Sequence, residues 1–343
     1  MKEQIWAKIG KVEWYNTFEL LPGVVTPGVI PFDAAGHLSS LGVGQDLSGQ
    51  RALDIGTWDG PMAFELERRG ADVIALDVQD PSKTGFDTAK EILQSKVSYV
   101  QASVYELTKY LSGQFDLICF LFYHLKDPIK AFEEISAVLA DNGQVLFEGE
   151  CLRNYAESLS GHPEQGPLIE QIADAELPLA LCCPGDFKNL PNWFIPNFAA
   201  LRSWTGVAGL EILRYEFLED ADGKPVPYQR VRGIAGKASR AVKVTGVKQD
   251  SETIIVMGNG FTQRTVINFF CTQKGVYVNL GGLNPDGTAK IPLTIVDSGE
   301  LRFRVPAEAE PGRAYVEVLN PPYLAFQTSK NDPSGAFNLT SRP

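Results

Sequence analysis

Residues 51–80 constrain this chain more than any other stretch, because their pattern fits one small supersecondary unit. An apolar run at 52–55 is long enough for a buried strand, and a glycine-containing turn and a helical pattern follow it. A second apolar run, 73–76, ends at Asp77, which lies 23 positions after Asp54. This spacing is close to that of nucleotide-binding βαβ units, in which an acid at the end of the second strand accepts the hydroxyls of a ribose.

The turn distinguishes between kinds of nucleotide. Gly56 and Gly60 let the backbone approach a ligand closely, but Pro61 stands in the area where a dinucleotide fingerprint needs its third glycine. Asp54 and Asp59 make the turn acidic, which suits a cationic ligand better than a diphosphate. The turn therefore predicts S-adenosylmethionine, which carries a sulfonium and an ammonium group. Another nucleotide and a βαβ unit without any ligand are the alternatives.

The chain beyond this unit continues to alternate between helical and strand-like patterns. Helical patterns at 84–95 and from Pro128 separate the strands, and we expect a turn at 141–143 before the fifth strand. Five parallel strands closed by a hairpin, with its turn at 220–223, predict an α/β fold with a doubly wound, seven-stranded Rossmann-like sheet. The further strand-like segments are 97–100, 115–121, 144–150, 210–218 and 227–234.

Two regions interrupt this alternation. An N-terminal arm, residues 1–45, carries clustered aromatic side chains, and Tyr15 within it is a candidate lid over the ligand. Simple packing of the arm on the domain is the alternative. An insert at 151–196 is long for a compact domain, which is typical of functional loops. Its Trp193 and Phe194 are candidates to stack on a flat or sugar-ring acceptor, with a hydrophobic plug as the alternative.

The pattern of apolar and polar residues changes from about Val242. Helical periodicity ends there, and short β-rich runs follow, separated by Gly, Asn, Asp and Pro turns. We therefore predict two domains: residues 1–240 with the α/β sheet, and residues 241–343 as an all-β sandwich of the immunoglobulin-like kind. The β-rich runs are 254–257, 265–271, 276–280, 291–295, 301–305 and 314–318.

The first domain carries the negative charge of the chain. Net charge is −11, and residues 241–343 hold 10 basic and 9 acidic side chains, so 21 basic and 33 acidic ones remain in residues 1–240. This excess of acid disfavours nucleic acid as a partner. No apolar run reaches the roughly 18 residues that span a bilayer, and the first residues lack the apolar core of a signal peptide. Five cysteines without metal-ligand spacing complete the expectation of a reduced, cytoplasmic protein away from membranes.

Histidine is the natural base for methyl transfer to a hydroxyl, and the chain has three. His124 follows the fourth strand at its carboxyl end, where open α/β sheets place their sites, so it is the candidate base beside Tyr123. A histidine with a purely structural hydrogen bond is the alternative. His162 lies in the insert and is a candidate for substrate contact or a residue of a solvated loop, and we expect His37 at the surface.

Two acids provide a second catalytic candidate. Glu148 and Glu150 lie two positions apart near the end of the fifth strand, so their side chains share one face of the sheet. Glu150 is closer to the carboxyl end and is therefore the candidate to reach the cleft as a base or an orienting group. A metal site is the weaker alternative, since no cluster of His and Asp accompanies these acids.

Five segments, taken in order, carry a family resemblance that covers nearly all of the first domain. They resemble class I S-adenosylmethionine-dependent methyltransferases, and more narrowly the group named after the wobble-uridine tRNA methyltransferases. In the second domain, residues 254–261, 305–307 and 311–312 resemble TIG-type immunoglobulin-like domains. The five segments are 14–15 with 23–28, 53–60, 75–77, 122–128 and 193–197.

This resemblance implies a cofactor site at named positions. Tyr123 and His124 would face the methyl group, and Tyr15 would cover the cofactor. The other implied contacts are Asp54, Gly56 and Gly60 under the methionine part, Thr57 and Trp58 along its side, Asp77 at the ribose, Val78 on the adenine face, Ser103 and Val104 beside the base, and Cys119 and Phe120 beneath the sulfonium.

One departure from that group bears on the substrate. The wobble-uridine enzyme uses a carboxylated cofactor, held by cations that include a lysine upstream of the first motif. Residues 29–41 contain no Lys or Arg, and a buried carboxylate without a cation is costly. We therefore expect ordinary S-adenosylmethionine and O-methylation of a small-molecule acceptor. The alternatives are a tRNA wobble-uridine modifier, and a non-catalytic scaffold whose β-sandwich binds a partner protein or a glycan or forms a homodimer.

Overall fold

The chain forms two compact units, residues 1–237 and 238–343, and each has a hydrophobic core of its own. Tyr123, His162 and the turn at 220–223, which the sequence singled out, lie outside the described residues. The computed structural model describes residues 2–122, 124–152, 166–175, 177–182, 192–218, 230–238, 242–284, 288–320 and 333–341.

The centre of the first unit is a seven-stranded sheet with the order β12-β13-β9-β8-β5-β6-β7. Its strands from β9 to β7 are parallel, whereas β12 and β13 form an antiparallel hairpin beside β9. The predicted five parallel strands with a closing hairpin are therefore confirmed. In chain order the strands are β5 (Arg51–Ile55), β6 (Asp72–Asp77), β7 (Ser98–Gln101), β8 (Phe115–Leu121), β9 (Leu139–Glu150), β12 (Leu210–Phe217) and β13 (Arg230–Lys237).

Strand order reverses at β5. The strands β6 and β7 follow on one side of β5, and β8 and β9 follow on the other. In open α/β sheets, ligands bind outside the carboxyl ends of the strands at such a reversal. The topology therefore directs attention to the residues that follow β5, β6, β8 and β9.

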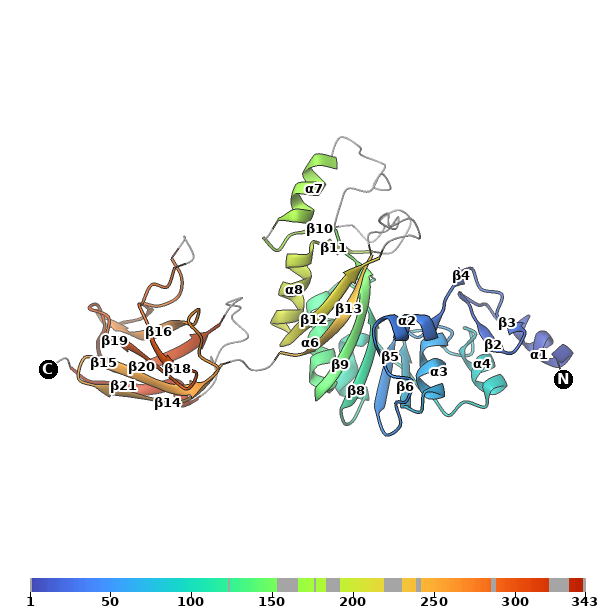
Figure 1. Ribbon diagram of the computed structural model, residues 1–343, viewed down its shortest axis with the longest axis horizontal. Coiled ribbons are helices and arrows are strands. Elements are labelled where there is room, and N and C mark those ends of the chain that lie inside the picture. The colour runs from blue at the N-terminus through green and yellow to red at the C-terminus, as the bar shows by residue number, and fades with distance from the viewer. Residues whose placement is uncertain are drawn as a thin grey trace. The chain divides into compact units, whose positions relative to one another are not determined.

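Helices cover both faces of this sheet (Figure 1). The face that carries Ala52 of β5 and Cys119 of β8 shares a buried cluster with the first four helices. The opposite face carries Leu53 and Ile118 and packs against the later helices. The first group is α1 (Lys2–Ile9), α2 (Ala34–Ser40), α3 (Pro61–Arg68) and α4 (Phe86–Leu93), and the second is η1 (Val104–Glu106), α5 (Leu107–Tyr110), α6 (Pro128–Val138) and α8 (Phe198–Val207).

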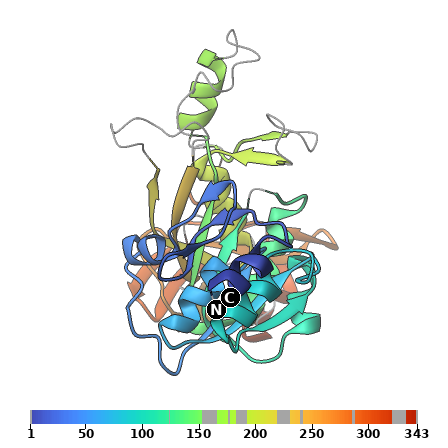
Figure 2. The same ribbon diagram turned by 90° about the vertical axis from the view of Figure 1, so that its right-hand side faces the viewer.

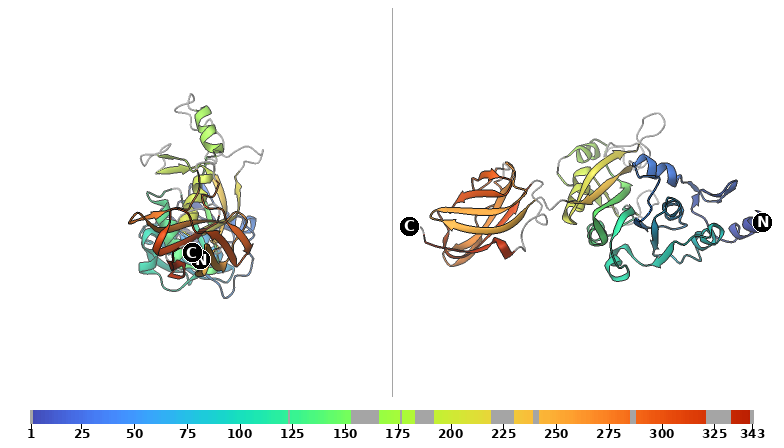
Figure 3. Two further views of the ribbon diagram at one scale, coloured as in Figure 1. Left: turned by 90° about the vertical axis from the view of Figure 1, so that its left-hand side faces the viewer. Right: turned by 60° about the horizontal axis from the view of Figure 1, so that its bottom comes forward.

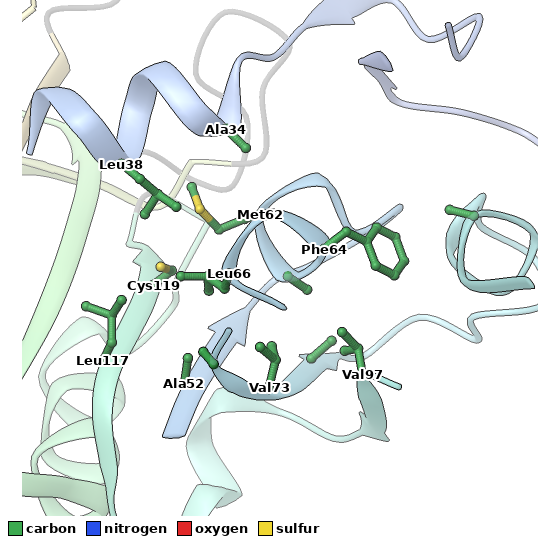
Figure 4. Close-up of a cluster of buried hydrophobic side chains, with 14 of the residues drawn as sticks. Ala34, Leu38, Ala52, Met62, Phe64, Leu66, Val73, Val97, Leu117 and Cys119 are labelled. Carbon is green, nitrogen blue, oxygen red and sulfur yellow. The ribbon is translucent and has the colours of Figure 1, made fainter. Parts of the chain in front are cut away.

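Helix α2 is anchored in the first of these clusters. Leu38 is fully buried, and Figure 4 shows it directed from α2 toward Met62 of α3, above Cys119 of β8. Leu66 of α3 completes the contact and is also fully buried. The helix predicted after the glycine-containing turn is therefore confirmed, and its apolar face holds α2 against the sheet.

Two predictions about local structure were wrong. The expected turn at 141–143 lies inside β9, where the pairing with β8 is irregular but continues to Leu139. Gly143 allows β9 to approach β8 closely at this point, because a Cβ on this residue would lie 2.8 Å from the Phe115 carbonyl oxygen. The insert also holds regular structure in its described parts: α7 (Gly166–Asp174), which projects beyond the sheet in Figure 2, and the paired strands β10 (Ala180–Cys182) and β11 (Phe194–Pro196).

The second unit consists of two four-stranded sheets, β14-β15-β19-β18 and β17-β16-β20-β21, which the right panel of Figure 3 shows as layers. Inward residues such as Phe269 and Leu301 are fully buried between them. β14 was not predicted because its sequence, KVTGVKQD, is mostly polar, and β18 begins later than expected. The strands are β14 (Lys243–Asp250), β15 (Thr253–Asn259), β16 (Val266–Gln273), β17 (Val276–Asn279), β18 (Thr294–Asp297), β19 (Glu300–Arg304), β20 (Glu310–Leu319) and β21 (Ala336–Leu339).

Candidate cofactor and acceptor site

The turn after β5 leaves polar atoms and open space at the carboxyl edge of the sheet. Gly56 has φ +78°, and a Cβ placed on it would find no atom within 4 Å. Asp54 is 5% exposed, and its Oδ2 has no hydrogen-bond partner among the described residues; the same holds for the buried Oγ1 of Thr57. Burial raises the pKa of Asp54 to about 7; the neighbouring Thr57 hydroxyl lowers it, and the charge of Asp77 raises it. A ligand that supplies a positive charge and hydrogen-bond donors would satisfy this turn.

Asp77 fixes the shape of the turn from the end of β6. Its Oδ2 accepts a hydrogen bond from the Trp58 N–H at 2.9 Å, and its Oδ1 accepts one from the Gln79 N–H at 3.0 Å. Thr84 donates its hydroxyl to the Trp58 carbonyl at 3.0 Å, so both backbone groups of Trp58 are held while its φ is +48°. A carboxylate has about four acceptor positions, so Asp77 keeps capacity for two ribose hydroxyls.

Asp59 does not face the ligand edge, which corrects the prediction that it makes the turn acidic. Its side chain is fully buried, and its Oδ2 accepts hydrogen bonds from the Tyr15 and Asn16 N–H groups, both at 2.8 Å. The Asn16 side-chain amide donates to Oδ1. Burial raises the pKa of Asp59, but three donors from the arm compensate its charge. This acid therefore fastens the N-terminal arm to the turn.

The N-terminal arm packs on the domain, and this packing also fixes the place of Tyr15. Trp14 is buried against Gly85, where a Cβ would lie 2.4 Å from the indole, and its Nε1 donates to the Ile9 carbonyl at 2.9 Å. The next residue, Tyr15, is 46% exposed and lies 5.8 Å from the Trp58 ring, centroid to centroid. Packing of Trp14 thus holds Tyr15 beside the turn, in the position that a lid requires.

The adenine side of the predicted site has an exposed apolar residue. Val78, directly after β6, is 59% exposed. Val104 is buried, and Ser103 accepts a hydrogen bond from the Tyr105 N–H as the cap of η1. Gly60 has a packing role in the structure, since a Cβ on it would lie 2.5 Å from the Phe64 ring. Of the two glycines in the turn, only Gly56 borders open space.

The end of β8 exposes a residue that the sequence prediction missed. Cys119 and Phe120, the predicted contacts beneath the sulfonium, are 5% and 3% exposed and belong to the cores on opposite faces. Burial raises the pKa of Cys119 well above its ordinary value. Leu121 is 41% exposed. The strand period of two predicts it on the same face as Cys119, so counting two positions further along β8 would have found it.

His37 lies in a charge cluster, and the expectation that it is a surface residue was wrong. Its side chain is 15% exposed, and its Nδ1 is 3.5 Å from Glu148 Oε2. The other oxygen of Glu148 is 2.7 Å from Arg230 Nη2 on the neighbouring strand β13. Glu148 is thus paired on both oxygens. Only the long-range pairing of β13 with β9 brings Arg230 here, which explains why local sequence patterns missed it.

The other catalytic candidates divide between buried and exposed positions. Glu150 is 5% exposed and lies opposite Arg230 in the β9–β13 pairing, on the same face as Glu148, as predicted. His124 lies in a turn and is exposed. Tyr123, beside it, is outside the described residues. The structure therefore brings the two glutamates together and leaves His124 on the solvent side of the loop after β8.

One face of Trp193 already has a neighbour. The Lys126 ammonium lies 4.5 Å from the centroid of the Trp193 ring, and Phe194 meets the Trp204 ring edge-on at 6.3 Å. These contacts join the insert to the loop after β8 and to α8. The predicted stacking of an acceptor on Trp193 is therefore restricted to the ring surface that Lys126 does not cover.

The centre of the first unit resembles known proteins. Residues 53–147 match the family described as a methyltransferase domain. Ubiquinone biosynthesis O-methyltransferase of Acinetobacter baumannii (strain AYE) is 31% identical over 104 residues, which make up 29% of this chain and 44% of the relative. The tRNA U34 carboxymethyltransferase of Campylobacter jejuni (strain ATCC 700819) is 26% identical over 170 residues, 48% of this chain and 51% of the relative. The chain thus spans about half the length of the curated relatives it matches.

Solved structures give a weaker likeness. Magnesium protoporphyrin IX methyltransferase from Synechocystis PCC 6803, solved with bound SAH, superposes with a TM-score of 0.41 at 15% identity, covering 59% of this chain and 80% of that one. The fold description above rests on strand order and register and not on this superposition. No helix in the described parts of the chain is long and apolar enough to cross a membrane.

Proposed function

We propose that the first unit binds S-adenosylmethionine and transfers its methyl group to the oxygen of a small-molecule acceptor. The observation that carries this proposal is the turn after β5, inside the matched methyltransferase segment. There a buried, unpaired Asp54 oxygen lies beside the open space at Gly56. When bound, the cofactor supplies a methyl group on a positively charged sulfur.

Different residues at this edge of the sheet contact different parts of the cofactor. The Asp54 carboxylate and the Thr57 hydroxyl face the polar methionine end, where their unpaired oxygens gain partners. Asp77 accepts the ribose hydroxyls with the acceptor positions that Trp58 and Gln79 leave free. Tyr15 and Trp58 cover this part of the site and exclude water.

A neutral acceptor fits the opposite side of the edge. Glu148 is already compensated by Arg230, so the strand ends of β9 and β13 offer no unpaired charge at that residue to a charged acceptor. The relative that acts in ubiquinone biosynthesis is named as an O-methyltransferase, which supports oxygen as the acceptor atom. An acceptor held in line with the sulfur–methyl bond gains several kcal/mol from positioning alone.

Thermal unfolding tests whether the first unit binds S-adenosylmethionine. All five tryptophans lie in residues 6–204, so tryptophan fluorescence reports the first unit only. S-adenosylmethionine at 100 times its dissociation constant should stabilise this unit by about 2.7 kcal/mol, whereas NADH and ATP at the same concentration should not. Equal shifts with all three ligands, or none, would reject the proposal.

Action on tRNA is the second candidate, because the Campylobacter relative named for tRNA U34 matches the longer stretch of this chain. The charge of residues 1–240 opposes it, since 33 acidic side chains face 21 basic ones. A gel-shift titration with total tRNA at low and at moderate salt distinguishes the two. Salt-sensitive binding would favour tRNA, and no binding at low salt would leave the small-molecule acceptor.

For the second unit we propose an immunoglobulin-like sandwich of the TIG kind that binds a partner or a second copy of the chain. Its two four-stranded sheets support the sandwich, and the residues near 254–261 support the TIG resemblance. Sedimentation of the full chain tests self-association. A dimer that persists at micromolar concentration supports it, and a monomer restricts the unit to other partners.

A further inference from the structure

Helix α2 presents His37 from a fixed position. Asp33 caps the helix by accepting a hydrogen bond from the Gly36 N–H at 2.9 Å, and Leu38 is fully buried. The buried guanidinium of Arg69 donates to the Ala35 carbonyl at 2.9 Å. Cap, core contact and guanidinium together hold one turn of helix, so the place of His37 is set by the fold.

His37 and Glu148 are arranged as a histidine–carboxylate pair. Nδ1 of His37 faces Glu148 Oε2 at 3.5 Å, and Arg230 holds the other carboxylate oxygen at 2.7 Å. A carboxylate beside Nδ1 favours the tautomer with its proton there, which leaves the lone pair on Nε2. No hydrogen bond reaches Nε2 within the described parts of the chain, and the Phe32 ring lies 6.0 Å from the imidazole.

Burial, more than the surrounding charges, favours the neutral form of the His37 imidazole. Burial lowers the pKa of His37 from its ordinary 6.5; Glu148 raises it, Arg232 and Arg230 lower it, and Asp33 raises it. A neutral imidazole whose Nε2 carries a lone pair can accept the proton of a hydroxyl group. His124, by contrast, lies in an exposed turn.

This pair lies on the same edge of the sheet as the cofactor turn. Ile55 of β5, Phe120 of β8 and Phe147 of β9 are register partners, so the residues that follow them, Gly56, Leu121 and Glu148, form the next row. Gly56 and Glu148 are thus two strand spacings apart, roughly 10 Å. The exposed Leu121 lies between them. An acceptor over Leu121 would have the cofactor turn on one side and the imidazole on the other.

Resting on the methyl transfer proposed above, we propose that His37 is the base for a hydroxyl acceptor, with Glu148 and Arg230 as its positioning residues. The acceptor oxygen forms a bond to the methyl carbon while the sulfur–methyl bond breaks and leaves its electron pair on sulfur. The hydroxyl proton moves to Nε2 of His37. It passes to water when the methylated product leaves, which restores the neutral imidazole.

The test uses the full chain with S-adenosylmethionine and catechol, a small neutral acceptor with two hydroxyls. His37→Gln should lower kcat about 100-fold, the contribution expected of a general base, with the dissociation constant for S-adenosylhomocysteine within about twofold of wild type. The wild-type kcat/KM for catechol, which reports the free enzyme, should rise with pH along a limb of the pH profile whose pKa is below 6.5. Glu148→Gln should move this limb to lower pH, because it removes the charge that raises the pKa of His37.

A matched control is available on the neighbouring strand. Glu211→Gln removes an exposed carboxylate of β12 that is not among the charges acting on His37, so kcat and the pH limb should not change. The inference is overturned if His37→Gln keeps the wild-type kcat, if His124→Gln causes the loss instead, or if Glu148→Gln leaves the limb in place. Wild-type protein that binds S-adenosylhomocysteine but does not methylate catechol would also overturn it, with the cofactor proposal intact. Failure to bind S-adenosylhomocysteine would reject the proposed function itself.

Discussion

The carboxyl edge of the seven-stranded sheet has two halves, which differ in whether their acidic side chains have ion-pair partners. Over β5 and β6, the acids Asp54 and Asp77 have no ion pair within the described residues, and one oxygen of Asp54 has no hydrogen-bond partner there. Over β9 and β13, Glu148 is paired with Arg230 and lies beside His37. The first half therefore favours a cationic ligand, whereas the second is already compensated and suits a neutral ligand.

This difference assigns one ligand to each half. A buried, unpaired carboxylate is unfavourable in the free protein and becomes favourable when a cationic ligand binds, so it contributes binding energy at the expense of stability. A compensated carboxylate contributes no such energy, but it can orient a histidine. Each prediction below changes one residue in one half, or in the arm that covers it, and asks whether the halves behave differently.

The largest effect is expected for Asp59, the acid that binds the N-terminal arm and contacts neither proposed ligand. Asp59→Ala removes three hydrogen bonds from the arm and should lower the free energy of unfolding of the first unit by about 3 kcal/mol, since each bond to a charged acceptor contributes about 1 kcal/mol or more. Urea titration followed by tryptophan fluorescence measures it. Glu133→Ala, at an exposed position of α6, is the control and should leave unfolding unchanged. A similar stability in both variants would mean that Asp59 does not hold the arm.

A pH series on the free protein tests the unpaired acid. The pKa of Asp54 is about 7 in the folded chain and 3.8 ordinarily, so its protonated form stabilises the fold, and this contribution is lost as pH rises from about 4 through 7. Asp54→Asn should remove the loss. The stability of this variant relative to wild type should therefore increase by about 2–3 kcal/mol between pH 5 and pH 8. Parallel curves for the two proteins would show that Asp54 is not buried and unpaired.

Removal of the second acid should act on binding and only secondarily on stability. Asp77→Ala deletes the acceptor for the ribose and for the Trp58 N–H, and should raise the cofactor dissociation constant about 10- to 100-fold. Asp72→Ala, at the exposed start of the same strand, is the matched control. If both variants bind as the wild type does, the ribose does not meet β6.

The smallest effect concerns the lid. Tyr15→Ala removes a ring that lies over one side of Trp58, and should weaken cofactor binding by about threefold to fivefold, less than 1 kcal/mol. Trp6→Ala removes another exposed aromatic side chain of the arm and should have no effect on binding. Equal losses for both variants would indicate that the arm acts through general stability.

Local sequence patterns were sufficient for the parts of this site that local structure determines. The strand–turn–helix at residues 52–68 and the acid ending β6 follow from apolar runs, glycines and Pro61, and the structure has them where they were predicted. The cap of α8 is equally local, because the Asn197 side chain accepts a hydrogen bond from the Ala200 N–H at 2.8 Å. Each of these features depends on residues within a few positions of one another.

Long-range contacts account for what the sequence did not reveal. Asp59 and Asp54 are the same residue type five positions apart. The arm at residues 15–16 donates hydrogen bonds to Asp59, whereas one oxygen of Asp54 has no partner among the described residues. His37 carries no local mark of its contact with Glu148, more than a hundred positions away. Register, and not composition, decides these environments. The polar strand β14 was missed for a similar reason, because pairing with β15 holds it in place.

Calorimetric titration of the full chain with S-adenosylmethionine at pH 6.5, in two buffers of different ionisation enthalpy, tests most directly whether the cationic cofactor binds beside Asp54. A cation beside Asp54 should shift this carboxyl to its charged form, so binding should release about 0.75 proton, the protonated fraction at pH 6.5 of a group with a pKa of about 7. Asp54→Asn should bind without this release. No binding heat in the wild type, or binding with no proton release, would contradict the account.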